Sequence, residues 1–327
     1  MKSIKLQNPV PILAGASVVG KKEAQGPLGD CFDYTLSEGH FGQKTWEKAE
    51  RELQGEAVRF ALDKAGKTRV DCIFSGDLLN QCIASSFAHR ASNTAYVGLY
   101  GACSTFAEGM ALAALGINAG YTECAAVSVS SHFCSAERQY RYPNEYGGCR
   151  TPTAQWTVTG AGCVILGGEA PPKITSVTLG KIVDRGITDV NHMGGAMAPA
   201  AYETIRQVLD DGGYAPSDFD LIATGDLGKV GSDLLEDLFR MEDGVSIGDV
   251  HYDCGCAIFD ESQDVKSGGS GAGCSAVVFA SHLLPRMQRG ELKKVLFAGT
   301  GALLSPLTVQ QGESIPCICH AVVVEVD

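Results

Sequence analysis

Apolar strands and apolar helices alternate along this chain, and the alternation recurs in its second half. Residues 70–78 read VDCIFSGDL and residues 219–227 read FDLIATGDL, so both halves contain an apolar strand that ends at Gly-Asp-Leu. A glycine-containing turn follows in each half, GACST at 101–105 and GAGCS at 271–275. The same order at similar spacing predicts a duplicated β/α unit.

The segments after the two turns support the same interpretation. After the first turn, a helical pattern ends at Gly120 and precedes the strand-like ECAAVSVSS. After the second turn, another ends at Gly290 and precedes KKVLFAGTG. Each strand, helix, strand element should form a right-handed crossover in a sheet covered by helices. Two fused copies should pack about a pseudo-twofold axis. We place the boundary at Pro171-Pro172, which gives halves 1–170 and 171–327.

Composition narrows the class of protein. The chain has 327 residues, 45% of them apolar, and a formal charge of −12, which disfavours a nucleic-acid surface because phosphate binding needs a basic face. We identify neither a secretory signal nor an apolar stretch long enough to span a bilayer, so we expect a soluble or peripheral protein. Thirteen scattered cysteines indicate reduced core residues, without the spacing of a zinc site.

Cys103 is the first candidate for chemistry. The predicted helix that starts beside it would supply unpaired N–H groups and positive potential, which lower a thiol pKa and attract anions. Cys103 is thus either a nucleophile or a small packing residue. A nucleophile would need a base, for which His132, after the strand-like SVSS, and His320, in the C-terminal strand, are the best candidates.

Two other segments are distinctive. Residues 135–150 concentrate three arginines and three tyrosines, which suit either a carboxylate ligand or a subunit interface; a solvated loop is the third possibility. The run GGSGAG at 268–273 lacks a P-loop lysine and the dinucleotide spacing, so it indicates close backbone approach rather than phosphate binding.

The duplicated halves, Cys103 at a helix start and the later VTGAGCVILG resemble the thiolase superfamily, especially its ketoacyl-synthase-III-like branch. The resemblance implies duplicated βαβαβ units in α/β/α/β/α layers. It also implies a nucleophilic cysteine at Cys103, a histidine after the second-half strand and an asparagine before the later helix. This chain has Gly225-Asp226 and Gly269-Ser270 at those places, so we expect no enzyme and no catalytic residue.

A longer series of motifs, among them GPLGDCFD, GDLLNQ, SSHFCSAERQYRYPNEYGG, MGGAMAPAA and TGDLGKVGS, resembles the stage V sporulation protein AD family. The resemblance implies a non-enzymatic protein that binds dipicolinic acid, alone or as its calcium chelate. It also implies a peripheral place on the inner spore membrane, within a channel complex that moves dipicolinate in sporulation and germination. Thiolase-like proteins are commonly dimers, so a homodimer is expected.

A flat ring with two carboxylates needs an apolar slot and directed donors. The predicted ligand-binding residues are Cys103, Ser104, His132, Asp226, Cys274 and His320. We predict no cofactor and no metal site of the protein's own; calcium, if it accompanies the ligand, would prefer oxygen from Asp226 or Asp253. The alternatives are a Cys103-dependent acyltransferase or condensing enzyme and a purely structural scaffold.

Overall fold

The computed structural model describes residues 2–140 and 150–326. Its strands are Ile4–Val19 (β1), Tyr34–Thr35 (β2), Cys72–Gly76 (β3), Ala95–Gly98 (β4), Cys124–Ser131 (β5), Trp156–Thr157 (β6), Gly160–Gly167 (β7), Lys173–Thr178 (β8), Leu221–Thr224 (β9), His251–Asp253 (β10), Gly269–Ser270 (β11), Lys294–Ala302 (β12) and Cys317–Glu325 (β13). Its α-helices are Lys21–Ala24 (α1), Trp46–Lys64 (α2), Ile83–His89 (α3), Thr105–Asn118 (α4), Phe133–Tyr140 (α5), Met193–Gly212 (α6), Gly228–Leu238 (α7), Cys254–Ala257 (α8), Ala272–Val278 (α9), Leu284–Gln288 (α10) and Pro306–Gln310 (α11).

The strand pairing repeats between the halves. In the first half β1 and β5 flank β7 antiparallel, and β5, β3 and β4 are parallel neighbours. In the second half β8 and β12 flank β13 antiparallel, and β12, β9 and β10 are parallel neighbours. The long strand β1 joins the two sets, because its first part pairs with β8 and its second part with β7. The predicted duplication is therefore visible in the topology.

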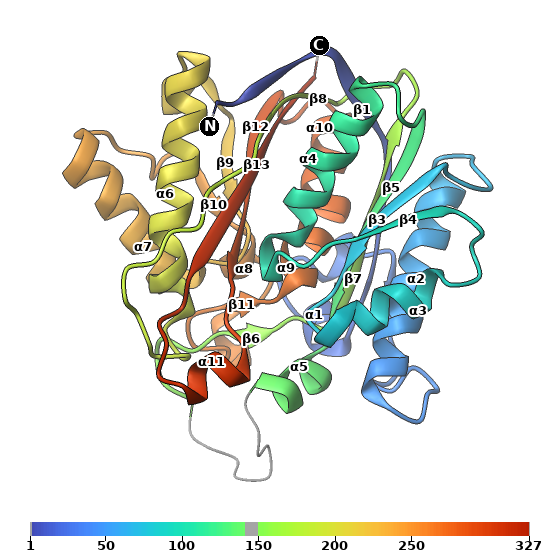
Figure 1. Ribbon diagram of the computed structural model, residues 1–327, viewed down its shortest axis with the longest axis horizontal. Helices are drawn as coiled ribbons and strands as arrows, with labels where there is room; N and C mark the ends of the chain where they lie inside the picture. The colour runs from blue at the N-terminus through green and yellow to red at the C-terminus, as the bar shows by residue number, and fades with distance from the viewer. Residues whose placement is uncertain (1, 141–149, 327) are drawn as a thin grey trace.

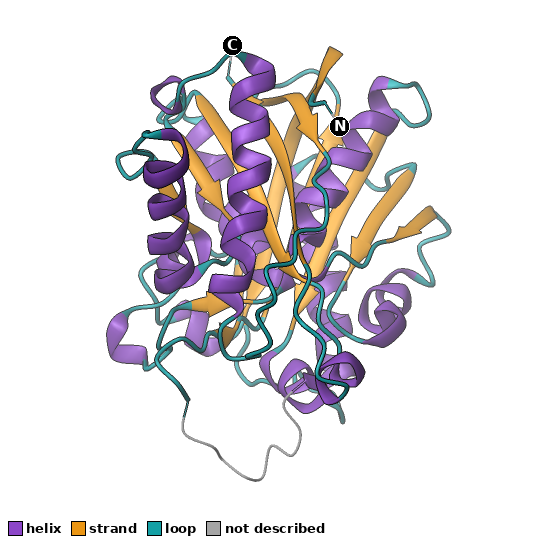
Figure 2. Ribbon diagram, turned by 60° about the vertical axis from the view of Figure 1, so that its left-hand side comes forward, coloured by secondary structure: helices purple, strands orange, loops and turns teal. Residues whose placement is uncertain are grey.

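The layers follow from which helices contact which strands. Helix α2 covers the outer face of the first set and α6 the outer face of the second. Helices α4 and α9 lie between the two sets, where α4 contacts β5 and β13 and α9 contacts β7. Figure 1 shows these layers from α6 and α7 on one side to α2 and α3 on the other. Figure 2 shows the strands flanked by helices from another side. The predicted α/β/α/β/α layering is confirmed.

The central helices explain why their sequences are so apolar. Helix α4 is buried over most of its length, and Phe106 packs against Phe279 and Phe297 with ring centroids 5.9 and 6.0 Å away. The second central helix contains one π-helical turn, Phe279–Leu283, between α9 and α10. Small residues let these helices approach the sheets; a Cβ on Gly162, for example, would lie 2.4 Å from the Ala276 backbone.

The predicted boundary near 170 falls between β7 and β8, where the Pro171-Pro172 peptide bond is cis. The division into halves 1–170 and 171–327 stays a prediction. Among the described residues, none of the helices has the length and apolar character needed to cross a bilayer.

Candidate functional site

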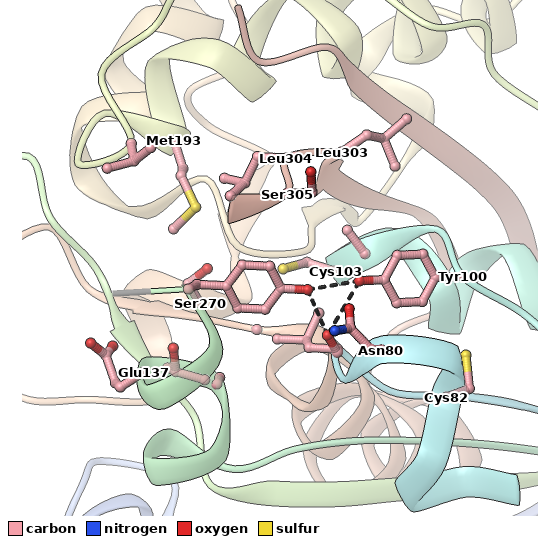
Figure 3. A pocket seen from close by; sticks show the side chains of 18 of the residues that line it. Asn80, Cys82, Tyr100, Cys103, Glu137, Met193, Ser270, Leu303, Leu304 and Ser305 are labelled. Carbon is pink, nitrogen blue, oxygen red and sulfur yellow. Dashed lines mark hydrogen bonds between the residues drawn. The ribbon is translucent and has the colours of Figure 1, made fainter. Parts of the chain in front are cut away.

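A cavity of about 510 Å³ lies where the predicted helix starts meet. Its walls come from the turn after β3, the turn before α4, helix α5, and the segments after β11 and β12. Figure 3 shows the side chains that line it. The apolar part of the lining includes Leu78, Val190, Met193, Ala302, Leu303 and Leu304. This size and character are those of a small-molecule site.

Left-handed backbone marks the walls of this cavity. Gln81 and Cys82, in the short helix Asn80–Cys82, have φ of 58° and 51°, and Ala102, beside Cys103, has φ of 51°. A residue with a side chain pays of order 1–3 kcal/mol for such a conformation, which persists when the surroundings enforce it. Three strained residues on one cavity favour a functional site.

Asp77 holds the strained turn in place. This carboxylate is fully buried and accepts hydrogen bonds from the backbone N–H groups of Leu79, at 2.8 Å, and Ser85, at 2.7 Å. These donors lie on either side of Gln81 and Cys82. The Asp of the first Gly-Asp-Leu motif therefore anchors the start of α3 and one cavity wall.

Asp226, the Asp of the second Gly-Asp-Leu motif, has a different role. Its carboxylate accepts hydrogen bonds from the hydroxyls of Ser270 and Thr300, both at 2.8 Å, and from the Gly271 N–H at 3.0 Å. The Cys103 thiol is a close electrostatic neighbour of this carboxylate. The structure therefore brings Cys103, Asp226 and Ser270 together, and their correspondence to the Cys, His and Asn of the superfamily stays a prediction.

The electrostatics at Cys103 oppose a nucleophilic thiolate. Burial, and next the Asp226 carboxylate, raise the pKa of the Cys103 thiol well above its usual value. Burial raises the pKa of Asp226 to about 6, so this group carries negative charge at neutral pH. The turn before α4 does not overcome these effects. The prediction that the helix start lowers the pKa of Cys103 is wrong, because burial of the thiol, and next the Asp226 carboxylate, raise this pKa.

The predicted ligand-binding residues occupy different places. Cys103 lines the cavity, and Asp226 lies directly behind it. Ser104 is buried and its hydroxyl donates to the Gly101 carbonyl at 2.6 Å, while Cys274 is fully buried in α9. Neither is among the residues that line the cavity. Whether any of the predicted set binds a ligand stays a prediction.

The two predicted histidines serve the backbone. The Nε2 atom of His132 lies 2.9 Å from the Gly39 carbonyl, and its Nδ1 accepts from the Cys134 N–H at 3.2 Å. The Nδ1 atom of His320 accepts from the Gly180 N–H at 3.2 Å, and burial lowers the pKa of His320 to about 4. Both lie outside the cavity lining, so neither is placed as a base for Cys103.

The carboxylates suggested for calcium already have donors. Asp253 accepts from three backbone N–H groups, at 2.8 to 2.9 Å, and from the Thr224 hydroxyl at 2.7 Å. The Asp226 carboxylate likewise accepts hydrogen bonds from Ser270, Gly271 and Thr300. Among the described residues, no group of three or more His, Cys, Asp or Glu side chains could hold a metal ion.

The first residues of the arginine- and tyrosine-rich segment 135–150 contribute to the cavity. Glu137 and Tyr140 of α5 line it. Arg150 lies 3.3 Å from Glu137 and stacks over the Trp156 ring at 4.6 Å from its centroid. Arg141, Tyr142 and Tyr146 lie outside the described residues.

Sequence reasoning missed Asn80, Gln81, Cys82 and Tyr100. A signal for the first three existed, because they follow a parallel strand directly and ligands of α/β sheets bind at the carboxyl ends of strands. Tyr100 had no comparable signal.

Comparison with known proteins decides the family. A model of the family "Stage V sporulation protein AD (SpoVAD)" matches residues 1–325. The chain belongs to the stage V sporulation protein AD family. It is 45% identical to stage V sporulation protein AD of Bacillus subtilis (strain 168) over 323 residues, which cover 98% of this chain and 95% of the relative. The resemblance seen in the sequence motifs is confirmed.

Solved structures of condensing enzymes share the fold. The 3-oxoacyl-[acyl-carrier-protein] synthase III of Aquifex aeolicus VF5 superimposes with a TM-score of 0.58 at 13% identity, over 97% of this chain and 100% of that one. Cerulenin-bound OleA of Xanthomonas campestris gives 0.61 at 15% identity, over 98% and 100%. The tetronic acid condensing enzyme AbyA1 gives 0.61 at 16% identity, over 97% and 100%. At these identities the likeness concerns the fold alone.

Proposed function

We propose that the chain binds dipicolinic acid, alone or as its calcium chelate, without transforming it. The observation that carries the proposal is the pairing of Cys103 with the Asp226 carboxylate. A condensing enzyme needs a thiolate and proton-handling partners beside it. Here burial, and next the Asp226 carboxylate, favour the protonated form of Cys103, and the cavity remains available for binding.

The cavity suits a flat aromatic acid. Leu78, Leu303 and Met193 supply apolar surface for the faces of a ring, and Asn80, Thr157 and Ser305 supply neutral polar groups. Membership of a sporulation protein family supports a ligand found in spores. Calcium would enter as part of the ligand, because Asp226 and Asp253 are engaged.

We further propose that the chain acts as a peripheral member of a channel complex on the inner spore membrane, as its family suggests, and as a homodimer. Strand β4 ends the strand order and is largely exposed; its Tyr96 is 37% exposed, and Phe87 of α3 is 50% exposed. An open strand edge with aromatic neighbours is a surface that a second copy could cover. Size-exclusion chromatography with light-scattering detection of the molar mass tests the dimer. A monomer at micromolar concentration would contradict it.

Calorimetry with dipicolinate tests the binding function. The titration is run once in buffer that contains a chelator to remove calcium, and once with calcium equimolar to dipicolinate. Isophthalate, which lacks the ring nitrogen, is the control ligand. We expect one site per chain and weaker heats with isophthalate. If the folded protein gives no binding heat with either form of dipicolinate, the proposal is wrong.

The alternative, a Cys103-dependent acyltransferase, is favoured by the condensing-enzyme fold and the retained thiol. Intact-mass measurement after mixing with acyl-CoA donors separates the two functions. A mass increase that Cys103→Ala abolishes would favour the acyltransferase, and an unmodified chain across several donors would favour binding alone.

A further inference from the structure

Two tyrosine hydroxyls meet at the cavity wall. Tyr140 ends α5 and Tyr100 lies between β4 and the turn that carries Cys103. Both residues line the cavity, and their hydroxyl oxygens are 2.7 Å apart. Figure 3 shows the Tyr100 hydroxyl inside the ring of lining residues, close to Cys103 and Asn80.

The Tyr140 hydroxyl has a firm partner. It donates to the Leu78 carbonyl at 2.5 Å, and the Gln139 amide donates to the same carbonyl at 3.0 Å. A carbonyl oxygen has two lone pairs, so these donors saturate it. The Tyr100 hydroxyl, 3.3 Å from Leu78 O, is a third donor to an acceptor already in use.

The Tyr100 hydroxyl therefore has two weak acceptors, the shared Leu78 carbonyl at 3.3 Å and the Tyr140 phenol oxygen at 2.7 Å. A phenol oxygen is a neutral acceptor, whereas hydrogen bonds to a carboxylate are roughly twice as strong as neutral ones. Turning the Tyr100 proton toward a carboxylate in the cavity would exchange the weaker bond for a stronger one, while Tyr140 keeps its bond to Leu78.

The charges at the cavity make such a neutral donor important. Among the described residues that line it there is no Lys, Arg or His, and Glu137 is the one carboxylate. Burial raises the pKa of both Tyr100 and Tyr140, so the two hydroxyls keep their protons at neutral pH. The Asp226 carboxylate close to this wall would repel the carboxylate of a bound acid. Such an acid would therefore be held by neutral hydroxyl and amide donors.

We propose that Tyr100 is a specificity-determining residue that donates its hydroxyl proton to a ligand carboxylate, and that Tyr140 is a positioning residue that holds Tyr100 toward the cavity. The inference rests on the proposed function, because it assigns a carboxylate-reading role within the same site.

Tyr100→Phe tests the donor, and Tyr96→Phe is the matched control. The Tyr96 hydroxyl also has a hydroxyl partner, Ser85 at 3.0 Å, but Tyr96 does not line the cavity. Tyr100 is 48% exposed, so removal of its hydroxyl should leave the fold intact. Calorimetry is run with dipicolinate and with pyridine-2,6-dicarboxamide, which has the same shape without the charge.

We expect Tyr100→Phe to weaken dipicolinate binding about tenfold, as for a hydrogen bond to a charged acceptor, and diamide binding by a smaller factor. Tyr140→Phe should also weaken dipicolinate binding, and Tyr96→Phe should leave both ligands unchanged. An unchanged dipicolinate affinity in Tyr100→Phe, or an equal loss for both ligands, would overturn the inference while leaving the proposed function in place. If the unsubstituted chain binds no dipicolinate, the proposed function fails instead.

Discussion

Asp226→Asn should make the Cys103 thiol more reactive toward alkylating reagents. The carboxylate has donors at both oxygens: Oδ2 accepts from Ser270 and Gly271, and Oδ1 accepts from Thr300. An asparagine can place its amide oxygen at the first position and its NH₂ group against the Thr300 hydroxyl, which is also able to accept. The substitution therefore removes the charge and keeps a hydrogen bond to Ser270, Gly271 and Thr300, with the direction reversed at Thr300.

The size of the effect follows from the charge removed. Two unit charges about 4 Å apart interact by about 4 kcal/mol at an effective dielectric constant of about 20, which corresponds to a roughly thousandfold larger thiolate fraction. A less basic thiolate is also a weaker nucleophile, with a Brønsted coefficient of about 0.5, so about thirtyfold of the gain should remain in the alkylation rate. Burial of Cys103 persists and keeps its pKa above the usual value.

Alkylation with iodoacetamide at pH 8, followed by peptide mass spectrometry, measures the rate at each cysteine. Exposed Cys31 is the internal standard, and Cys82 reports access to the cavity, because it lines the same space but is influenced by Asp77. If Cys103 in a folded Asp226→Asn variant reacts no faster relative to Cys82, the assigned role of Asp226 is wrong.

Three further predictions concern residues around the cavity. Asp77→Asn should lower the free energy of unfolding by about 1.5–3 kcal/mol in urea titrations, because an asparagine NH₂ cannot accept and so the N–H of Leu79 or Ser85 loses its acceptor. The looser cavity wall should also weaken dipicolinate binding. Burial raises the pKa of Glu50 to about 8 from 4.5, so the native state binds more protons than the unfolded chain between these values and stability falls as pH rises through them; Glu50→Gln should remove this loss and be more stabilising at pH 8 than at pH 5. His320→Ala should lower the unfolding free energy by about 1–3 kcal/mol, because the Gly180 N–H loses its acceptor, yet change dipicolinate affinity less than twofold; a large loss of affinity in a folded variant would restore His320 as a ligand residue.

The local pattern of apolar residues and glycines along the sequence was enough to predict the architecture. The apolar strands ending at Gly-Asp-Leu and the helices opening at Gly-rich turns are written in consecutive residues, and their repetition predicts the paired strand orders that the structure shows. The sequence also places Cys103 beside a helix start.

Only the tertiary structure decided how those residues act on one another. Asp77 and Asp226 occupy equivalent places in the repeat, but one anchors a turn and the other raises the pKa of a neighbouring buried thiol. His132 and His320 follow or lie in strands as predicted, yet backbone groups engage their rings. A pKa and a hydrogen-bond partner depend on burial and on neighbours distant in sequence, and these are set only when the two halves pack together.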